Sequence, residues 1–340
     1  MIDPRKELEG LFDRFVPKLR SAFQIAISDV VDNAVLKDLI AAVKANQINT
    51  VFKLLGFSEA AMRPLTAAIE ETFETGGIFV GRTFPKILNT SDGRMIFRFN
   101  VKNERAESWL RNNSSALVGR LEDEARTNVR NTLQAGMSDG RNPRKVALDI
   151  VGRMNRQTGH REGGIIGLSK NQESWVRSAR TKLTTLDKNY FDLQLRDKRF
   201  DSTVAKAIES GKPLSGEVVD KLMDRYKANA LKKRALDIAQ TETIQSLNRA
   251  DYEATKQAVD SGAVRNGAVT REWDTTGLDN VRNSHRGMDG QKVGLDEAFT
   301  TPRGDRLMFP GDRSLNAPAR EIVNCHCRVK TVVDWFDGVE

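Results

Sequence analysis

Cysteine and histidine are scarce in this chain, and their scarcity restricts the chemistry that it can perform. The 340 residues include two cysteines, Cys325 and Cys327, and three histidines, His160, His285 and His326. Two cysteines separated by one residue cannot build a disulfide framework, so we expect a chain made in a reducing cytosol. A metal, thiol or imidazole site has to be sought in the last quarter, which holds both cysteines and two of the histidines.

Long apolar runs are missing and aromatic residues are few. No apolar run approaches the roughly 20 residues that cross a bilayer, and the N-terminal residues mix acids with bases, so we expect neither a membrane span nor a signal peptide. Hydrophobic residues make up 39%, aromatic residues 6% and charged residues 29% of the chain. This balance favours a helix-rich protein with much wetted surface, and the length favours two or three domains.

The positive charge is moderate, +8 from 54 basic and 46 acidic residues. Basic residues are densest in residues 196–234, where eleven Lys or Arg residues stand against six acidic ones. No ladder of aromatic residues interleaves them, although base stacking normally accompanies single-strand binding. Two interpretations stay open: a solvated helical face, or contact of Lys232, Lys233 and Arg234 with the phosphates of DNA.

The first ninety residues predict a helical region. Apolar side chains recur there at helical spacing, as at Leu8, Leu11, Phe12, Phe15 and Leu19. We expect short amphipathic helices with loops near residue 56 and at residues 76–77, where glycines occur.

Residues 91–235 predict a second helical region. An apolar stripe indicates one long helix from about residue 103 to residue 140. Asn142 with Pro143 opens the next helix, and Ser169 with Gln172 forms a capping box for another. The glycine-rich residues 163–170 lack the order of a Walker phosphate loop. Helical character then continues from residue 215 to residue 262, with room for one break.

The third region, residues 236–340, predicts a small α+β module. Alternating residues from Val269 to Trp273 and from Arg328 to Val333 indicate strands, and Asp289 with Gly290 indicates a tight turn. The predicted fold class is therefore α+β, with mostly α-helical N-terminal and middle regions and a small C-terminal α+β module.

Four residues of this module could hold a metal ion: His285, Asp289, Cys325 and Cys327. Four such ligands suit a tetrahedral structural zinc. Two cysteines on a straight strand would splay their sulfurs, so an unmetallated, buried Cys-His cluster is an alternative. A thiol nucleophile with His285 as its base and Asp289 orienting the ring is a third interpretation.

A polar stretch precedes the module on a helix, at residues 239–243 with Asn248 and Arg249, and Glu242, Gln245 and Arg249 lie on one helical stripe. One interpretation is a network of ion pairs at the surface. In the other, the stripe packs against the module, and Arg282 or Ser284 hydrogen-bonds Glu242, because a buried acid needs a partner.

These polar positions form an ordered series that resembles the phage Mu F-like minor head proteins. The series comprises Thr241, Glu242, Asn248, Trp273, Asp279, Arg282, Ser284, His285, Asp289, Asp312, Glu321, Cys325 and Cys327. Upstream stretches at residues 142–144, 162–168 and 195–201 are also similar to Mu-like relatives. Gln240 and His326 depart from the family pattern, which often has arginine at both positions.

The resemblance implies a head morphogenesis protein of a tailed phage, present in few copies inside the head near the portal. It would assist head assembly and DNA packaging or ejection, in the host cytoplasm during assembly and then in the virion. The implied partners are the portal protein, the major capsid protein and, weakly and without sequence preference, phage DNA; no membrane is implied. We expect no enzymatic activity, no cofactor other than a structural zinc, and docking to portal or capsid through residues 1–90.

Two other classes of function stay open. A metal-dependent hydrolase or nuclease would use His285, Cys325 and Cys327 to hold the metal, with Glu242 or Asp289 as the base. A DNA-binding accessory factor would use the basic residues 232–234.

Overall fold

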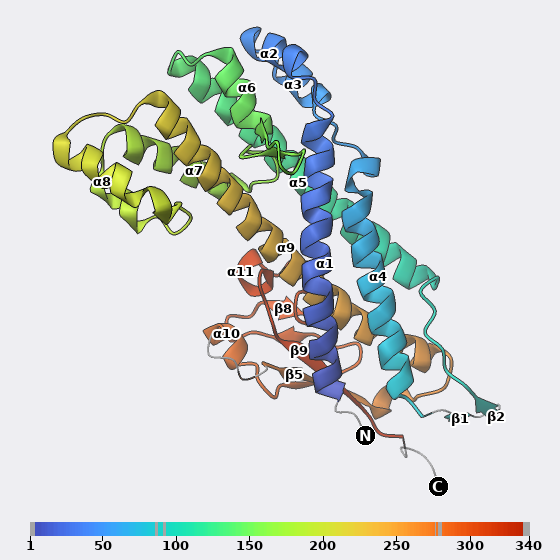
Figure 1. Ribbon diagram of the computed structural model, residues 1–340. Helices are drawn as coiled ribbons and strands as arrows, with labels where there is room; N and C mark the ends of the chain where they lie inside the picture. Colours follow the sequence, from blue (N-terminus) through green and yellow to red (C-terminus); the bar gives the residue numbers. More distant parts are fainter. Residues whose placement is uncertain (1–3, 86–87, 91–92, 276, 278–280, 336–340) are drawn as a thin grey trace. The chain divides into compact units, whose positions relative to one another are not determined.

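The computed structural model describes residues 4–85, 88–90, 93–275, 277 and 281–335. These residues are mostly helical and include a few small antiparallel sheets, which confirms the predicted α+β class (Figure 1). Contacts divide the chain into two compact units: unit 1 contains residues 1–22, 65–114 and 236–340, and unit 2 contains residues 23–64 and 115–235. The predicted domain limits at residues 90 and 235 divide the chain along its sequence and stay a prediction. In the described ranges, no helix combines the length and the apolar character that a membrane span requires.

Four long helices contribute residues to both units: α1 (Pro4–Asp32), α4 (Glu59–Thr83), α5 (Glu104–Ser138) and α9 (Gly216–Asp260). The long helix expected between residues 103 and 140 is α5. The prediction of short helices was wrong for α1 and α4, which have 29 and 25 residues. The α9 helix continues over 45 residues without a break. Continuous burial of one face explains these lengths, because tertiary packing outweighs the local glycine and proline signals.

Gly76 and Gly77, which were expected in a loop, lie inside α4. A β-carbon on Gly76 would lie 3.0 Å from the side chain of Leu247 and 3.1 Å from that of Ala250. Glycine therefore lets α4 approach α9 closely within unit 1, and its role here is packing rather than chain reversal.

Unit 2 confirms the predicted helix ends. Its shorter elements are α2 (Leu36–Lys44), α3 (Ile48–Leu54), α6 (Pro143–Val151), β3 (Arg153–Met154), β4 (Arg161–Glu162), α7 (Lys170–Thr184), the 3₁₀ turns η1 (Lys188–Asp192) and η2 (Lys198–Phe200), and α8 (Asp201–Ser210). Asn142 caps α6 by accepting from the Arg144 amide, and Ser169 with Gln172 forms the capping box of α7. These side chains satisfy amide groups that have no partner inside a helix.

The glycine-rich stretch after β4 is a packing turn around the end of α6. The Ile165 amide donates to the carbonyl oxygens of Asp149 and Ile150, at 3.0 and 3.1 Å. A β-carbon on Gly164 would lie 2.6 Å from the Ile150 carbonyl oxygen, and Gly163 has a φ of +76°. Both glycines are therefore required by the backbone of this turn.

Replacing Gly164 by alanine should lower the stability of unit 2 by about 1–3 kcal/mol, because main-chain atoms of α6 have to move. Gly119→Ala is the matched control: Gly119 is exposed inside α5 with open space around it, so alanine should add about 0.5–1 kcal/mol. Thermal unfolding measures both changes. Equal effects of the two variants would contradict the proposed role of the turn.

Unit 2 also buries a carboxylate among three cations. Asp149 of α6 lies 2.7 Å from Nζ of Lys227 and also contacts Arg141 and Arg180. Burial alone would raise the pKa of Asp149, but Lys227, Arg141 and Arg180 hold this pKa well below its usual value. The ion pairs therefore join α6, α7 and α9 through one charged centre, which fits the need of a buried charge for partners.

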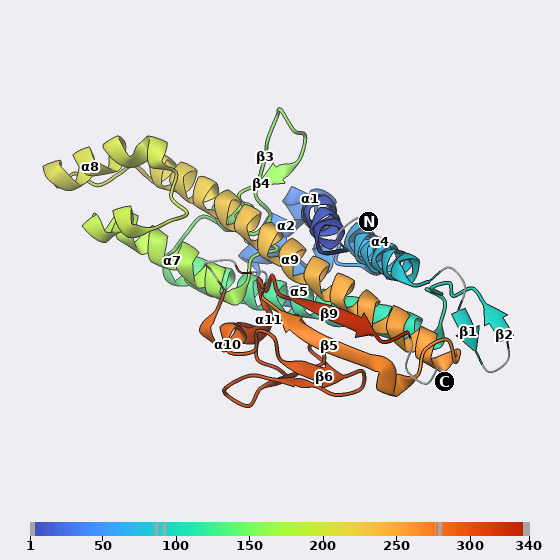
Figure 2. The same cartoon turned by 90° about the horizontal axis from the view of Figure 1, so that it is seen from below.

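The sheet of unit 1 has the order β6-β5-β9. Its strands are β5 (Val269–Asp274), β6 (Lys292–Gly294) and β9 (Arg328–Val333), all antiparallel, with Trp273 opposite Val329. The two strands expected around residues 269–273 and 328–333 are thus confirmed. The sheet runs alongside α9 (Figure 2), and Thr331 of β9 donates a hydrogen bond to Asp251 of α9.

The remaining elements of unit 1 are short. They are the pair β1 (Leu88–Thr90) and β2 (Gly93–Met95), the 3₁₀ turn η3 (Asn266–Ala268), α10 (Asn283–Arg286), the pair β7 (Phe299–Thr300) and β8 (Arg306–Leu307), and α11 (Ala319–Ile322). The side chains of Trp273, Phe299, Leu307 and Phe309 form a buried apolar cluster together with both cysteines. This cluster is the core of the C-terminal module.

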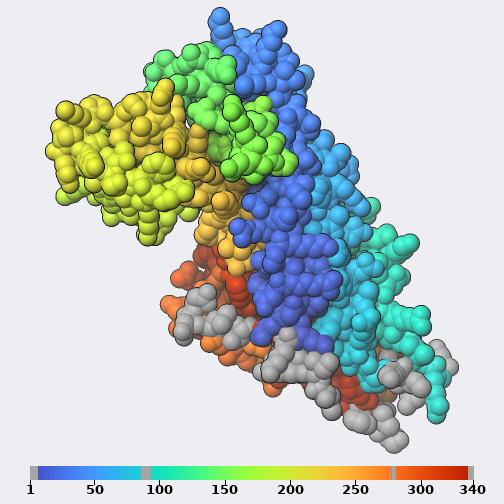
Figure 3. All heavy atoms as spheres, viewed as in Figure 1, coloured from blue at the N-terminus to red at the C-terminus, as the bar shows by residue number. Residues whose placement is uncertain are grey.

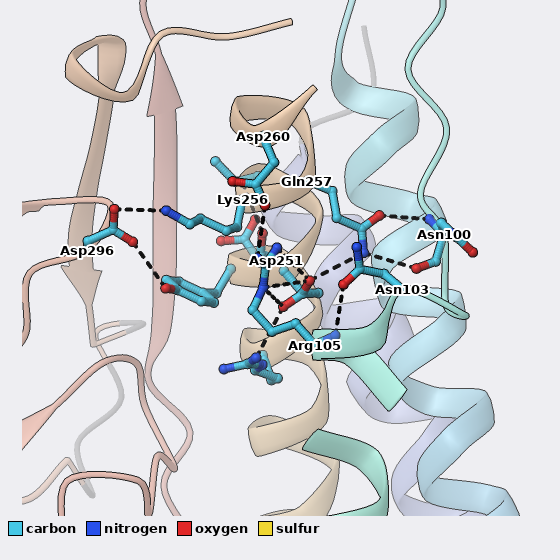
Figure 4. A network of polar contacts seen from close by, with 12 residues as sticks. Asn100, Asn103, Arg105, Asp251, Lys256, Gln257, Asp260 and Asp296 are labelled. Atoms are coloured by element: carbon cyan, nitrogen blue, oxygen red, sulfur yellow. Dashed lines mark hydrogen bonds and ion pairs between the residues drawn. The ribbon is translucent and has the colours of Figure 1, made fainter. Parts of the chain in front are cut away.

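A polar network holds the C-terminal half of α9 on two sides (Figure 4). The buried carboxylate of Glu253 accepts hydrogen bonds from Arg105, at 3.0 and 3.1 Å, and the Gln257 side chain bonds both backbone groups of Asn100. Lys256 of α9 pairs with Asp296 of the module at 2.9 Å. The buried acid is thus satisfied by partners from its own unit, as a buried charge requires.

The beginning of α1 packs against the C-terminal segment of the same unit. Rings of Phe12 and His326 lie 5.2 Å apart between centroids, and Arg328 pairs with Glu9. In the space-filling view the dark-blue beginning of α1 lies against red residues of this segment (Figure 3). Residues near both ends of the chain therefore build one unit.

Asp251 of α9 should make the stability of the folded chain depend on pH. Burial raises its pKa to about 6, although Thr331 and Arg271 act in the opposite direction. Folded protein then binds this proton more tightly than the unfolded chain, where an aspartate pKa is about 3.9. The contribution to stability is therefore largest below pH ~4 and is lost as the pH rises through about 6.

Asp251→Asn should remove this loss, because an amide cannot ionise and its oxygen still accepts from Thr331. We expect the melting temperature of the variant to exceed that of the wild type at pH 7.5, by a free-energy gain of about 1–3 kcal/mol. The advantage should vanish near pH 4, and the exposed Asp13→Asn serves as control. A lower melting temperature for Asp251→Asn at pH 7.5 would oppose this interpretation.

Candidate functional site

The two cysteines and one histidine of the C-terminal module converge on a single buried point. The Nδ1 atom of His285 lies 3.5 Å from Sγ of Cys325 and 3.4 Å from Sγ of Cys327. One ligand atom from each residue lies within 4.8 Å of the others, and all three residues are buried. The structure thus brings together three of the four predicted metal ligands.

Short elements position these three side chains. His285 belongs to α10, a single turn, and its ring stands edge-on to Trp273 of β5 with 5.0 Å between centroids. Cys325 and Cys327 lie in the extended segment between α11 and β9. The expectation that they lie on a straight strand was wrong, because β9 begins only at Arg328. The splaying of sulfurs that was predicted for a strand is not found.

The other ring nitrogen of His285 faces a carboxylate. Its Nε2 atom lies 3.2 Å from Oε2 of Glu321, outside hydrogen-bond geometry in this rotamer. Ser284 donates to the same oxygen at 2.7 Å, and Nε of Arg320 lies 3.3 Å from the other oxygen of Glu321. Glu321 is therefore a buried acid held in place by Ser284 of α10 and Arg320 of α11.

Hydrogen bonding links the two buried thiols. The hydrogen bond from Cys327 holds the pKa of Cys325 well below its usual value, with a further contribution from His285. The same interaction, together with burial, raises the pKa of Cys327 far above its usual value. Ionisation of one sulfur therefore opposes ionisation of the other.

Asp289 does not join the cluster. Its Oδ1 atom accepts hydrogen bonds from the amide and the hydroxyl of Thr275, at 2.9 and 2.8 Å. The expectation that Asp289 is a fourth ligand was therefore wrong: the acid fixes the turn after β5 instead. Asp279, which belongs to the polar series, lies outside the described residues.

A small cavity of about 30 Å³ borders the cluster. Its lining residues include Arg282, Asn324 and His326 as well as the three cluster residues. A cavity of this size holds at least one water molecule. The space next to the sulfurs therefore accommodates a solvent molecule.

The polar face of α9 packs against the module rather than forming a surface network. Its central residue is Asn248, whose amide donates to the carbonyl oxygens of Pro310 and Cys327, at 3.2 and 3.4 Å. The side-chain oxygen of Asn248 accepts from the amide of Val329 at 3.0 Å. One side chain thus binds the loop after β8 and the segment between the cysteines and β9.

Thr241 and Asp237, about two and three turns earlier on α9, continue this attachment. The Thr241 hydroxyl accepts from the amide of Asn324 at 3.0 Å, and Asp237 accepts from the side chain of Asn324 at 2.7 Å. Asn324 has a φ of +53°, a conformation that asparagine tolerates better than most residues. The cysteine segment is therefore fixed to α9 at both of its ends.

Glu242 is buried, but its predicted partners were wrong. Its carboxylate accepts from Asn113 at 3.2 Å and from Arg313 at 3.4 Å. Arg282 donates instead to backbone carbonyls of Arg320 and Val323, the latter at 2.7 Å, and Ser284 donates to Glu321. Asn113 and Arg313 could not be foreseen, because they lie 129 and 71 positions from Glu242 in the sequence.

Asp312 orders the loop in front of the helix. It accepts from the amides of Met308 and Ser314, each at 2.9 Å. The loop carries Gly311, with a φ of +88°, and a β-carbon there would lie 3.2 Å from Cα of Gln245. The Phe-Pro-Gly-Asp sequence is therefore a tight turn that fits against α9.

Lys232, Lys233 and Arg234, the residues expected to contact DNA, do not form one patch of solvent-facing positive charge. Arg234 pairs with Glu124 of α5 at 2.8 Å, whereas Lys232 and Lys233 are exposed. The arginine has a structural partner, so DNA contact by all three residues stays a prediction that the ion pair disfavours.

A different set of buried polar residues escaped sequence reasoning. Glu253 and Gln257 are buried and bond each other, and the partly exposed Arg105 donates to Glu253; none of the three was singled out, and Figure 4 labels Arg105 and Gln257. The spacing of Arg249, Glu253 and Gln257 by four residues was the available signal, since it places them on one helical face. Nothing local reveals that this face is buried.

Asn248→Ala should destabilise unit 1 by about 3 kcal/mol, because it leaves the Val329 amide and two buried carbonyls without partners. Asn248→Asp should be as damaging, since a carboxylate accepts but cannot donate to those carbonyls. Asn266→Ala removes an exposed amide of the same unit and should change stability by less than about 0.5 kcal/mol. Thermal melts compare them, and a mild effect of Asn248→Ala would contradict the assigned role.

These features define a class of protein: a helical protein with a small α+β module that buried polar contacts and a Cys-His cluster attach to one long helix. Residues 198–330 match the model of a family described as Phage Mu protein F like protein. This match over part of the chain confirms the resemblance to the phage Mu F-like family seen in the sequence. The match suggests a phage head morphogenesis protein.

The chain is also similar to a curated protein. The chain is 30% identical over 171 residues to an uncharacterized protein, YqbB, of Bacillus subtilis (strain 168). The match covers 49% of this chain and 50% of the relative, so the chain spans about half the length of that protein. No solved structure matches the chain.

Proposed function

We propose that the chain is a minor structural protein of a phage head, located inside the head near the portal, where it assists head assembly and DNA packaging or ejection. The observation that carries this proposal is the Mu F-like match over residues 198–330. The matched residues include the polar face of α9 and the cluster of His285, Cys325 and Cys327. Portal protein, major capsid protein and DNA are the proposed partners.

The use of the matched polar residues supports a structural rather than an enzymatic role. Thr241, Asn248, Ser284, Asp312 and Glu321 all contact groups of their own chain, as described above. A catalytic residue needs access to a substrate, whereas these side chains are buried or partly buried within one unit. We therefore assign these five residues a role in the stability of the folded chain.

The hydrolase alternative lacks its base. Among the described residues, the group that could hold a metal contains His285, Cys325 and Cys327 and no carboxylate. Glu242 is engaged by Asn113 and Arg313, and Asp289 by Thr275. Neither of these two acids is thus available to activate a water beside the sulfurs.

Docking through residues 1–90 needs a test other than deletion. Phe15, Leu19 and Phe23 of α1 are fully buried, and they belong to the cores of unit 1 and unit 2. Removal of this region would unfold the chain whatever its partners are. Ile25 and Val35 are better probes, because these apolar side chains are 49% and 57% exposed.

Ile25→Glu and Val35→Glu, together in one chain, should reduce its copy number in purified heads at least several-fold, because a charge on a docking face opposes burial. Quantitative mass spectrometry of heads from a complemented phage measures this number. The matched control is Met137→Glu, which changes an equally exposed apolar residue of α5.

The outcomes separate two parts of the proposal. Normal incorporation of the double variant would refute docking through residues 1–90 while leaving the head location intact. Absence of the wild-type chain from purified heads would refute the function itself.

A further inference from the structure

We propose that His285, Cys325 and Cys327 bind one zinc ion whose fourth ligand is a solvent molecule in the adjoining cavity, and that this ion fastens the C-terminal module. The site has three protein ligands and would form whether or not the chain acts in phage heads. Nδ1 of His285 is the ligating nitrogen, and Glu321 is the partner of the ligating imidazole.

The distances between the ligand atoms fit a tetrahedral zinc. With Zn–S bonds of about 2.3 Å and Zn–N bonds of about 2.0–2.1 Å, a tetrahedral angle places nitrogen and sulfur about 3.5–3.6 Å apart. The observed distances from Nδ1 of His285 to the two sulfurs are 3.5 and 3.4 Å. A metal could therefore be accommodated among these atoms with little rearrangement of the chain.

The environment of His285 is that of a zinc-ligating imidazole. Such a histidine generally donates its second ring N–H to a carboxylate or a carbonyl, which fixes the tautomer and the ring orientation. Here Nε2 lies 3.2 Å from Oε2 of Glu321, and Ser284 and Arg320 fix that carboxylate. A small rotation of the ring would complete the hydrogen bond, and Nδ1 would then offer its lone pair to the metal.

Charge balance favours the ion as well. Zinc binding replaces the thiol protons, so two thiolates and a neutral imidazole give an uncharged site around Zn²⁺. An uncharged site is compatible with the burial of all three residues. The remaining charge of Glu321 is balanced by Arg320, whose Nε lies 3.3 Å from its carboxylate.

The cavity identifies the fourth ligand. It measures about 30 Å³ and is lined by the three cluster residues together with Val281, Arg282, Asn324 and His326. None of the last four is a carboxylate or a thiol, the ring of His326 packs against Phe12 and is not part of the converging group, and Asp289 is occupied by Thr275. A water molecule fits this space and completes the tetrahedron.

Metal analysis tests the proposal on the full-length chain. After purification under reducing conditions and dialysis against buffer containing zinc, elemental analysis should find one zinc per chain. Cobalt(II) substitution of the wild type should give the strong visible absorption of a tetrahedral ion together with a thiolate charge-transfer band. A chelator should lower the melting temperature of the wild-type chain.

Variants locate the site. Cys327→Ser and His285→Gln should lose stoichiometric zinc, and Glu321→Gln should bind zinc about 10- to 100-fold more weakly. Asp289→Asn is the matched control, because its amide oxygen still accepts from Thr275; it should retain one zinc per chain. The cobalt spectrum of the wild type remains decisive if a variant fails to fold.

Three results would overturn the proposal. The first is a reduced wild-type chain that holds no stoichiometric zinc and gives no tetrahedral cobalt spectrum, which would establish an unmetallated thiol-imidazole cluster. The second is stoichiometric zinc in folded Cys327→Ser. The third is loss of the metal in folded Asp289→Asn, which would return that acid to the ligand set.

Discussion

The C-terminal module depends on the side chain of Asn248. One amide bonds the backbone of Pro310, Cys327 and Val329, and so it joins α9 to a loop, to the cysteine segment and to the edge of β9. Every one of those backbone groups would otherwise be buried without a partner, which is costly. This attachment fixes the cysteine segment against the helix, and the two thiols of that segment lie beside His285.

Residue patterns with a local cause were predictable. The capping box at Ser169, the cap at Asn142 and the strands on either side of the cysteines follow from short-range geometry, which is why the α+β class and many element ends were right. The convergence of His285 with Cys325 and Cys327 was within reach for another reason: few residues of the chain can bind a soft metal, so the candidates were few.

Features decided by distant segments were not predictable. Glu242 looked like a surface residue or a partner of Arg282, and its true partner Asn113 lies on α5. Gly76 and Gly77 looked like a loop, but the close approach of Leu247 makes glycine the residue that fits inside α4. Asp289 is a residue type that binds metals, but its carboxylate accepts a hydrogen bond from Thr275 instead. In each case the deciding contact comes from tertiary packing, which overrides local preference.

The central claim is that buried hydrogen bonds to α9 hold the cysteine segment. Amide hydrogen exchange of Val329 and Asn324 tests it most directly, since their N–H groups donate to Asn248 and Thr241. Our account predicts that both amides exchange as slowly as those in the centre of α9, because all would open together. Exchange of these two amides at the rate of exposed loops, with α9 still protected, would contradict it.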